Sequence, residues 1–405
     1  MAVGLVVPEV IHSVKGVRLA SHAAKIRKSG EPDLVLFEFS PDTSVAAVFT
    51  RNAFCAAPVS LAREHLRDSP IRALLINAGN ANAGTGSQGL ANARKSCEAI
   101  AGQLSISPEE VLPFSTGVIS EQLPMEKLLQ GIAQIGKGLS EDGWLAAAKG
   151  IMTTDTLPKI VSKKADIGGK EITVTGIAKG AGMICPDMAT MLAFIVTDAK
   201  VVAGDLQNCL DLAVRDSFNA ISVDGDTSTN DACVLAATGQ AGGPALTRDH
   251  PAWKGFQVLI DEACQSLAQA IVRDGEGATK FMTLNITQGR DENECRQVAY
   301  TIAHSPLVKT AFFASDPNVG RLLAAVGRSR LQDLDIATVD ISLDEVDIVI
   351  GGEPANTYTE ELGQMVMNRQ EITVNIALGR GQASSTVWTC DLSSDYVRIN
   401  ADYRS

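Results

Sequence analysis

Short apolar runs separated by turn-forming residues fill the first 80 residues of the chain. Three of these runs, at 34–39, 44–49 and 71–76, are rich in aliphatic and aromatic side chains, a composition typical of strands. Further along, apolar side chains recur every three or four residues, which predicts amphipathic helices. The helices are expected at 89–104, 125–135, 143–152, 206–218, 253–272, 292–303 and 316–326.

A second kind of apolar run appears in the middle of the chain. Residues 191–196 are entirely apolar and partly β-branched, which fits a buried strand better than a short helix. Four more strands are expected at 280–287, 346–350, 371–377 and 384–389. Because helices and strands alternate irregularly and many strands are consecutive, the pattern predicts an α/β (α+β) protein with layered mixed β-sheets flanked by helices. No Pro- or Ser-rich linker divides it into domains.

Composition and charge narrow the kinds of ligand. The chain has 405 residues, enough for a large core, and its 47 acidic and 35 basic side chains give a net charge of −12. No cluster of Lys and Arg is present, which argues against nucleic acid or an anionic membrane as a partner. Small molecules and other protein chains are the expected partners.

Cysteine and histidine are too dispersed to predict disulfides or a metal centre. The eight cysteines stand singly, as expected for reduced thiols in the cytoplasm. The five histidines form no metal-binding pair, and the acidic loop 222–231 lacks the glutamate that completes an EF-hand calcium loop. The amino terminus has no signal-peptide pattern, and no window is long enough to span a bilayer. We therefore expect a cytoplasmic protein with no metal and no membrane attachment.

Several small polar segments suit a functional site, but each also has an ordinary structural explanation. Residues 77–86 are a Gly- and Asn-rich connection, and 115–119 are a small polar turn whose amides could hold an oxyanion. Residues 153–156 are either a helix terminus or a pocket wall. Thr190 stands where a Gly-rich loop meets the apolar run, so its hydroxyl is either a nucleophile or a strand-capping group.

Nine motifs in a fixed order identify a family more specifically than any single segment does. They are Asn77-Ala-Gly-Asn-Ala-Asn-Ala, Ser115-Thr-Gly-Val-Ile, Met152-Thr-Thr-Asp-Thr, Lys179-Gly-Ala-Gly-Met-Ile, Met188-Ala-Thr-Met-Leu, Val223-Asp-Gly-Asp-Thr-Ser-Thr-Asn-Asp, Asp274-Gly-Glu-Gly-Ala-Thr-Lys, Asp316-Pro-Asn and Asn400-Ala-Asp-Tyr-Arg-Ser. Across essentially its whole length the chain resembles the ornithine acetyltransferase (ArgJ) family, also called glutamate N-acetyltransferase. It departs from the family pattern at Asp187, Ser120 and Val319, and at none of the implied catalytic groups.

The resemblance implies that the chain cuts itself at the Ala189–Thr190 bond. The products would be an α chain, 1–189, and a β chain, 190–405, which together form one intertwined unit of N-terminal-nucleophile architecture. The Thr190 hydroxyl would attack the Ala189 carbonyl, the acyl group would move from nitrogen to oxygen, and water would open the ester. The cut frees an α-amine on Thr190 with a reference pKa of about 7.7–8.0, which supplies the general base that is missing nearby.

The resemblance also implies a reaction, namely ping-pong transfer of acetyl from N2-acetyl-L-ornithine to L-glutamate through an acetyl-Thr190 intermediate. Thr116 and Gly117 match the family's oxyanion hole. Lys179 suits the substrate carboxylate and Glu276 an ammonium group. The implied substrate-binding positions are Thr153, Lys179, Thr190, Glu276, Asn400 and Ser405.

No bound cofactor is implied, and two α and two β chains are expected to assemble. The family contains members that use acetylornithine alone and members that also use acetyl-CoA, and the sequence leaves open which kind this is. Two other functions are considered. One is an N-terminal-nucleophile hydrolase or aminopeptidase, in which water takes the acyl group. The other is an uncleaved protein that senses acetylated amino acids, which the complete set of catalytic positions argues against.

Overall fold

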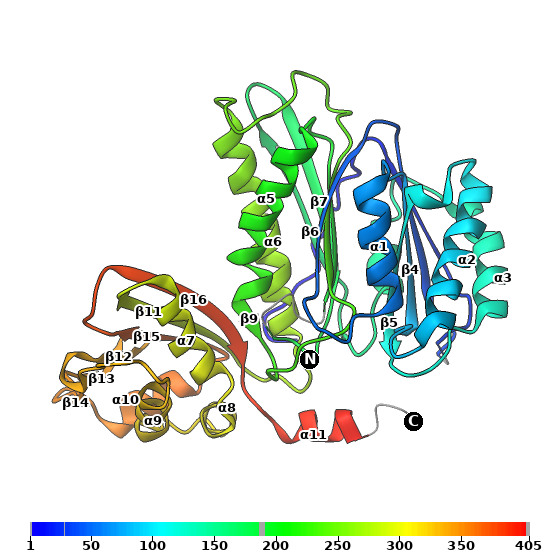
Figure 1. Cartoon of the computed structure of the whole chain (residues 1–405). Coiled ribbons are helices and arrows are strands. Elements are labelled where there is room, and N and C mark those ends of the chain that lie inside the picture. Colours follow the sequence, from blue (N-terminus) through cyan, green and yellow to red (C-terminus); the bar gives the residue numbers. More distant parts are fainter. Residues whose placement is uncertain (1, 28, 186–190, 402–405) are drawn as a thin grey trace.

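The computed structural model describes residues 2–27, 29–185 and 191–401 (Figure 1). Its strands form three mixed sheets. In spatial order, the first sheet contains β1 (Val17–His22), β2 (Leu34–Phe39), β4 (Ala73–Asn80) and β5 (Val111–Val118). The second contains β3 (Ser44–Phe49), β10 (Ala232–Ala237), β8 (Leu192–Thr197), β7 (Glu171–Lys179) and β6 (Lys159–Asp166). The third contains β14 (Glu353–Pro354), β13 (Val346–Ile350), β12 (Asp340–Leu343), β15 (Glu371–Ala377), β11 (Phe281–Gly289), β16 (Ala383–Cys390) and β9 (Ile221–Ser222).

The helices mostly follow the amphipathic segments of the sequence. They are α1 (Ala57–Asp68), α2 (Gly86–Leu104), α3 (Met125–Ile135), α4 (Trp144–Gly150), α5 (Ala203–Arg215), α6 (Trp253–Arg273), α7 (Glu292–Ala303), α8 (Pro306–Phe313), α9 (Val319–Gly327), α10 (Glu360–Met367) and α11 (Ser394–Ala401). Single 3₁₀ turns occupy Pro108–Glu110, Gly136–Gly138, Phe218–Ala220 and Ile336–Thr338.

The first two sheets pack face to face over an apolar core. In this core the Phe194 ring of β8 lies 5.6 Å from the Phe37 ring of β2 and 5.0 Å from the Phe114 ring of β5. Helices α2 and α3 cover the outer face of the first sheet, and α5 and α6 cover the outer face of the second. Four layers result, in the order helix, sheet, sheet, helix. The expectation of layered mixed sheets flanked by helices is confirmed.

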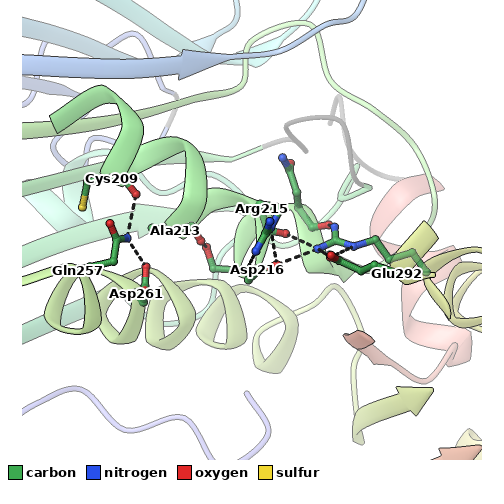
Figure 2. A network of polar contacts seen from close by, with 10 residues as sticks. Cys209, Ala213, Arg215, Asp216, Gln257, Asp261 and Glu292 are labelled. Carbon is green, nitrogen blue, oxygen red and sulfur yellow. Dashed lines mark hydrogen bonds and ion pairs between the residues drawn. The ribbon is translucent and has the colours of Figure 1, made fainter. Parts of the chain in front are cut away.

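The third sheet builds a separate apolar core with helices α7 to α10 and lies on the left of Figure 1. Polar contacts join it to the four-layer part, as Figure 2 shows in part. Arg296 of α7 pairs with Asp216, just after α5, at 2.9 Å and with Glu292 at 2.8 Å. In the same view Gln257 of α6 donates to the Cys209 carbonyl of α5 at 3.2 Å, so the two helices also share polar contacts.

Several sequence-based expectations need correction. The turn expected at 115–119 is the end of strand β5, which pairs in parallel with β4 as far as Val118. Its small residues allow this close pairing. The helix expected at 206–218 starts at Ala203 and ends at Arg215, and a separate 3₁₀ turn follows at Phe218–Ala220. The elements that the sequence analysis did not find are β1, β6, β7, β9, β10, β12, β14, α1, α8, α10 and α11, and it did not predict β5 as a strand.

Some expectations concern residues that the structure does not describe. Ala189, Thr190 and Ser405 lie outside the described residues, so division of the chain at 189/190 stays a prediction. The second sheet takes β3, β6 and β7 from before that bond and β8 and β10 from after it. Within the described ranges, no helix is long and apolar enough to cross a membrane. No three His, Cys, Asp or Glu side chains in that part of the chain are grouped to hold a metal ion.

Candidate active site

One cavity of about 210 Å³ brings together residues that are far apart in the sequence. Its walls come from the end of β5, the segment after α4, the end of β7, the segment after α6 and the end of α11. The predicted site residues that line it are Thr116, Gly117, Thr153, Lys179, Glu276 and Asn400. The structure therefore gathers every predicted site residue that it describes.

Strand β5 presents Thr116 and Gly117 to the cavity. Gly117 has a φ of +134°, a conformation that favours glycine. A Cβ atom at Gly117 would lie 2.3 Å from the carbonyl carbon of Gly79 on strand β4, so no side chain fits. Asn230 also lines the cavity, and its Nδ2 donates to the Ser115 carbonyl at 2.9 Å and to the Ala81 carbonyl at 2.7 Å.

Lys179 is the last residue of β7 and only 4% of it is exposed. Its ammonium donates to Thr116 Oγ1 at 3.1 Å. Burial lowers the pKa of Lys179 below its usual 10.5, and the carboxylates of Asp155, Asp231 and Glu276 oppose that shift. Thr116 is its single hydrogen-bond partner among the described residues, which leaves further N–H donors for a ligand.

Glu276 supplies the opposite charge in the same cavity. Its Oε2 accepts a hydrogen bond from Asn400 Nδ2 at 2.7 Å, and its amide donates to the Ala181 carbonyl at 2.8 Å. A Cβ atom at Gly182 would lie 2.5 Å from the Glu276 carboxyl group, so this glycine is needed for close approach. A cation and a carboxylate in one small cavity match the two charged ends of an amino acid.

A buried ion-pair network supports three walls of the cavity. Lys159 Nζ lies 2.6 Å from Asp155 Oδ1 and 2.7 Å from Asp274 Oδ2, and all three side chains are almost fully buried. Asp155 also accepts from the Thr153 amide at 2.9 Å and the Gly180 amide at 2.7 Å. Burial alone would raise the pKa of Asp155, but Lys159, Lys179 and the Gly180 amide lower it below its ordinary value.

Asp231 fixes the backbone next to the predicted nucleophile. Its Oδ1 accepts a hydrogen bond from the Met191 amide at 3.0 Å, and Met191 directly follows Thr190. Asp231 is 1% exposed, and burial raises its pKa well above the ordinary value even though the Met191 amide and Lys179 lower it. The sequence analysis assigned roles to neither Asp231 nor Asn230. The only indication in the sequence that these two residues matter is that they end the family motif that starts at Val223.

The layered fold and this charged cavity define the class of layered α/β proteins with a small polar cavity that suits a charged small molecule. The chain belongs to the ArgJ family, which it matches over residues 18–405. A protein of Methylococcus capsulatus named arginine biosynthesis bifunctional protein ArgJ is 57% identical over 97% of this chain and 96% of its own. A protein of the same name from Psychrobacter arcticus is 53% identical over the full length of both chains.

Two solved structures are also similar in sequence. The crystal structure of arginine biosynthesis bifunctional protein ArgJ from Bacillus halodurans is 38% identical, with a TM-score of 0.49, and the match covers 50% of this chain and 95% of that one. Ornithine acetyltransferase from Mycobacterium tuberculosis, solved in complex with ornithine, is 39% identical, with a TM-score of 0.39. That match covers 43% of this chain and 93% of the other.

Proposed function

We propose that this chain is a self-processing acetyltransferase of arginine biosynthesis that moves acetyl from N2-acetyl-L-ornithine to L-glutamate. The observation that carries the proposal is the single cavity in which Lys179 and Glu276 accompany Thr116 and Gly117. Both substrates are amino acids whose α-carboxylate suits Lys179, and the side-chain ammonium of acetylornithine suits Glu276. The names of the relatives support the same pathway.

Self-cleavage prepares the nucleophile. The Thr190 hydroxyl attacks the Ala189 carbonyl carbon, the carbon–nitrogen bond breaks, and an ester forms while the nitrogen of Thr190 takes up a proton. Water then hydrolyses the ester, which leaves a carboxylate on Ala189 and a free α-amine on Thr190. This amine, with a reference pKa of about 7.7–8.0, then accepts the hydroxyl proton during catalysis.

Acetyl transfer uses the same hydroxyl twice. Thr190 attacks the acetyl carbonyl of acetylornithine, the N–H groups of Thr116 and Gly117 stabilise the oxyanion, and ornithine leaves with a proton on its nitrogen. The glutamate amine then attacks acetyl-Thr190, which releases N-acetylglutamate and restores the hydroxyl. Lys179 holds the carboxylate of each substrate, Glu276 faces the ammonium group of the ornithine side chain, and Thr153, Asn400 and Ser405 complete the binding site.

The proposal leaves the second acetyl donor to experiment. A cavity of about 210 Å³ suits an acetylated amino acid, and the nucleotide of acetyl-CoA would have to lie outside it. Glutamate acetylation with acetyl-CoA as the sole donor separates a bifunctional enzyme from a monofunctional one. The proposed enzyme binds no cofactor, works in the cytoplasm and assembles from two α and two β chains.

Replacing Thr190 tests self-cleavage and transfer together. The wild-type protein should give fragments 1–189 and 190–405 by intact mass, whereas Thr190→Ala should stay whole and transfer no acetyl, because both steps need the hydroxyl. Thr197→Ala, at the other end of β8, should cleave and transfer normally. Cleavage at 189/190 in Thr190→Ala would contradict the proposal. Acetate release from acetylornithine without any need for glutamate would identify a hydrolase instead.

A further inference from the structure

We propose that the adjacent residues Asn230 and Asp231 are a pair of positioning residues that orient the oxyanion-hole peptide and the nucleophile relative to each other. The inference rests on the proposed function, because it concerns the geometry of acetyl transfer at Thr190. Neither side chain is assigned a chemical step. Each side chain binds a backbone peptide group that includes Thr116 of the oxyanion hole or Thr190, the proposed nucleophile.

Asn230 holds the oxyanion-hole peptide. Its Nδ2 donates to the Ser115 carbonyl at 2.9 Å, and that carbonyl belongs to the same peptide unit as the Thr116 N–H. A peptide unit is planar, so fixing the direction of its carbonyl fixes the direction of its N–H. The second donor of Nδ2 is used on the Ala81 carbonyl at 2.7 Å, which anchors Asn230 to the segment after β4.

Asp231 holds the peptide of the nucleophile in the same way. Its Oδ1 accepts from the Met191 amide at 3.0 Å, and that N–H shares a planar peptide unit with the carbonyl of Thr190. The Met191 amide is therefore held by a side chain that is 1% exposed. The Met191 carbonyl accepts from the Ala232 amide at 3.1 Å, so both sides of Met191 are tied to this segment.

The backbone around Asp231 is itself rigidly placed. The Asp231 carbonyl accepts from the Thr50 amide at 3.0 Å, and strand β10 begins one residue later between β3 and β8. Asn230 and Asp231 are adjacent residues joined by one peptide bond. A shift of one of the two backbone peptides that they hold is therefore transmitted to the other. The peptide group of Thr116 on the first sheet and the Met191 amide, just before β8 of the second sheet, are thereby held by one short segment.

Stability alone does not account for Asp231. Its Oδ2 is buried and accepts no hydrogen bond of ordinary geometry in the part of the chain that the structure describes, although Ser228 lies close enough to lower the pKa of the carboxyl group. Leaving a buried carboxyl oxygen unpaired costs free energy, which an apolar residue of similar size would avoid. The hydrogen bond that Oδ1 accepts from the Met191 amide explains why a carboxyl group stands at this position.

Two conservative variants separate the position of the acceptor from its ability to ionise. Asp231→Asn keeps an acceptor for the Met191 amide and loses the titratable carboxyl group, whereas Asp231→Glu keeps the carboxyl group and moves the acceptor by one methylene. We expect Asp231→Asn to transfer acetyl within about fivefold of the wild-type kcat. Asp231→Glu should lose about 100-fold in kcat and self-cleave more slowly, since a displacement of about 1 Å at a reacting group costs roughly that factor. KM for acetylornithine should change little in either.

Asp198 provides the matched control. It lies just past the other end of β8, is 2% exposed, and its Oδ1 accepts from the Thr173 amide at 2.8 Å. Asp198→Asn and Asp198→Glu should therefore reproduce any loss of folding without a loss of kcat per folded molecule, with folding measured by circular dichroism. Asn230→Asp, which removes both side-chain donors, should lower kcat as Asp231→Glu does. Asn82→Asp, which removes a buried bond to the Gly89 carbonyl, should not.

The outcomes distinguish this inference from the function on which it rests. If the wild-type protein neither self-cleaves nor transfers acetyl, the proposed function fails. If the wild type is active, the positioning role is overturned by any of three results. These are Asp231→Glu with wild-type kcat, Asp231→Asn as slow as Asp231→Glu, or a change in KM in place of kcat.

Discussion

At the scale of single residues, Gly117 is the position where backbone geometry limits the chemistry most directly. Its φ of +134° and the 2.3 Å that would separate a Cβ from the Gly79 carbonyl carbon leave no room for a side chain. Gly117→Ala must therefore push strand β5 away from β4 and move the N–H groups of the oxyanion hole. We expect kcat to fall about 10²- to 10³-fold, the usual cost of losing one oxyanion donor.

Gly102→Ala is the control for that measurement. A Cβ atom at Gly102, inside helix α2, meets nothing within 4 Å, and alanine favours the helix by about 1 kcal/mol. Gly102→Ala should keep kcat and raise the free energy of unfolding. Acetyl transfer at saturating substrate, with urea unfolding of the same samples, compares the two glycines. A wild-type kcat for Gly117→Ala would show that Gly117 is not part of the oxyanion hole.

Sequence analysis predicted the cavity residues better than their supports. Thr116, Lys179 and Glu276 were found because they lie in motifs of a family, and the structure brings them into one cavity. Taken alone, Lys179 and Glu276 are charged residues next to glycines. Charged residues in such loops are exposed in most proteins. That these two are buried and line the same cavity depends on segments up to 160 residues apart in the sequence, which local patterns do not reveal.

At the scale of elements, helix α11 is attached to the molecule by polar contacts. None of its described residues is buried. Tyr396 Oη donates to Asp224 Oδ2 at 3.2 Å, and Asp224 in turn accepts from the amides of Met183 and Ile184. Asn400, one turn further along, donates to Glu276 inside the cavity. The position of one cavity wall therefore depends on a few hydrogen bonds.

Tyr396→Phe should weaken substrate binding and leave the chemical step intact. The lost hydroxyl bond is worth about 0.5–1.5 kcal/mol, so KM for acetylornithine should rise roughly 2- to 12-fold with little change in kcat. Tyr358→Phe is the control, because the Tyr358 hydroxyl bonds to Glu360 in the third-sheet unit, at 3.4 Å. Steady-state kinetics of both variants suffice. A drop in kcat at constant KM would mean that α11 acts on the reaction itself.

Strand β10 shows why sequence analysis missed a buried element. Strand β10 reads Ala-Cys-Val-Leu-Ala-Ala and every residue is buried, so it has neither polar alternation nor a high β-propensity. It is a strand because β3 and β8 pair with it on both sides. Strand β5 continues through 115–118 for a similar reason, since β4 supplies a partner for residues that would form a turn by themselves. The amphipathic helices that the sequence did predict needed no such tertiary information.

At the scale of the whole molecule, a buried cation joins segments from both sides of the predicted cleavage bond. Lys159, at the start of β6, pairs with Asp155 before it and with Asp274 just after α6. Asp274 also accepts from the Thr156 amide at 2.9 Å. If the chain is cut at 189/190, this network is among the contacts that hold the two products together.

Lys159→Met should destabilise the molecule strongly, because it leaves two carboxylates buried without their cation. Breaking a buried pair in this way costs about 3–5 kcal/mol. Lys163, on the same strand, forms a 2.7 Å pair with Glu262 of α6, but both side chains are partly exposed. Lys163→Met should cost less than about 1 kcal/mol. Urea unfolding near neutral pH measures both, and equal effects would show that burial of the first pair is unimportant.

The pH dependence of that difference follows from the sign of the Asp155 shift. Its folded pKa lies below the ordinary 3.8, so its contribution to stability is present above 3.8 and is lost as the pH falls through the folded pKa. Without Lys159, the buried carboxyl should instead take up a proton well above 3.8 and relieve part of the cost. The gap in unfolding free energy between wild type and Lys159→Met should therefore narrow as the pH is lowered from about 7 to about 4. A gap that stays constant over this range would mean that lost packing, and not charge, causes the destabilisation.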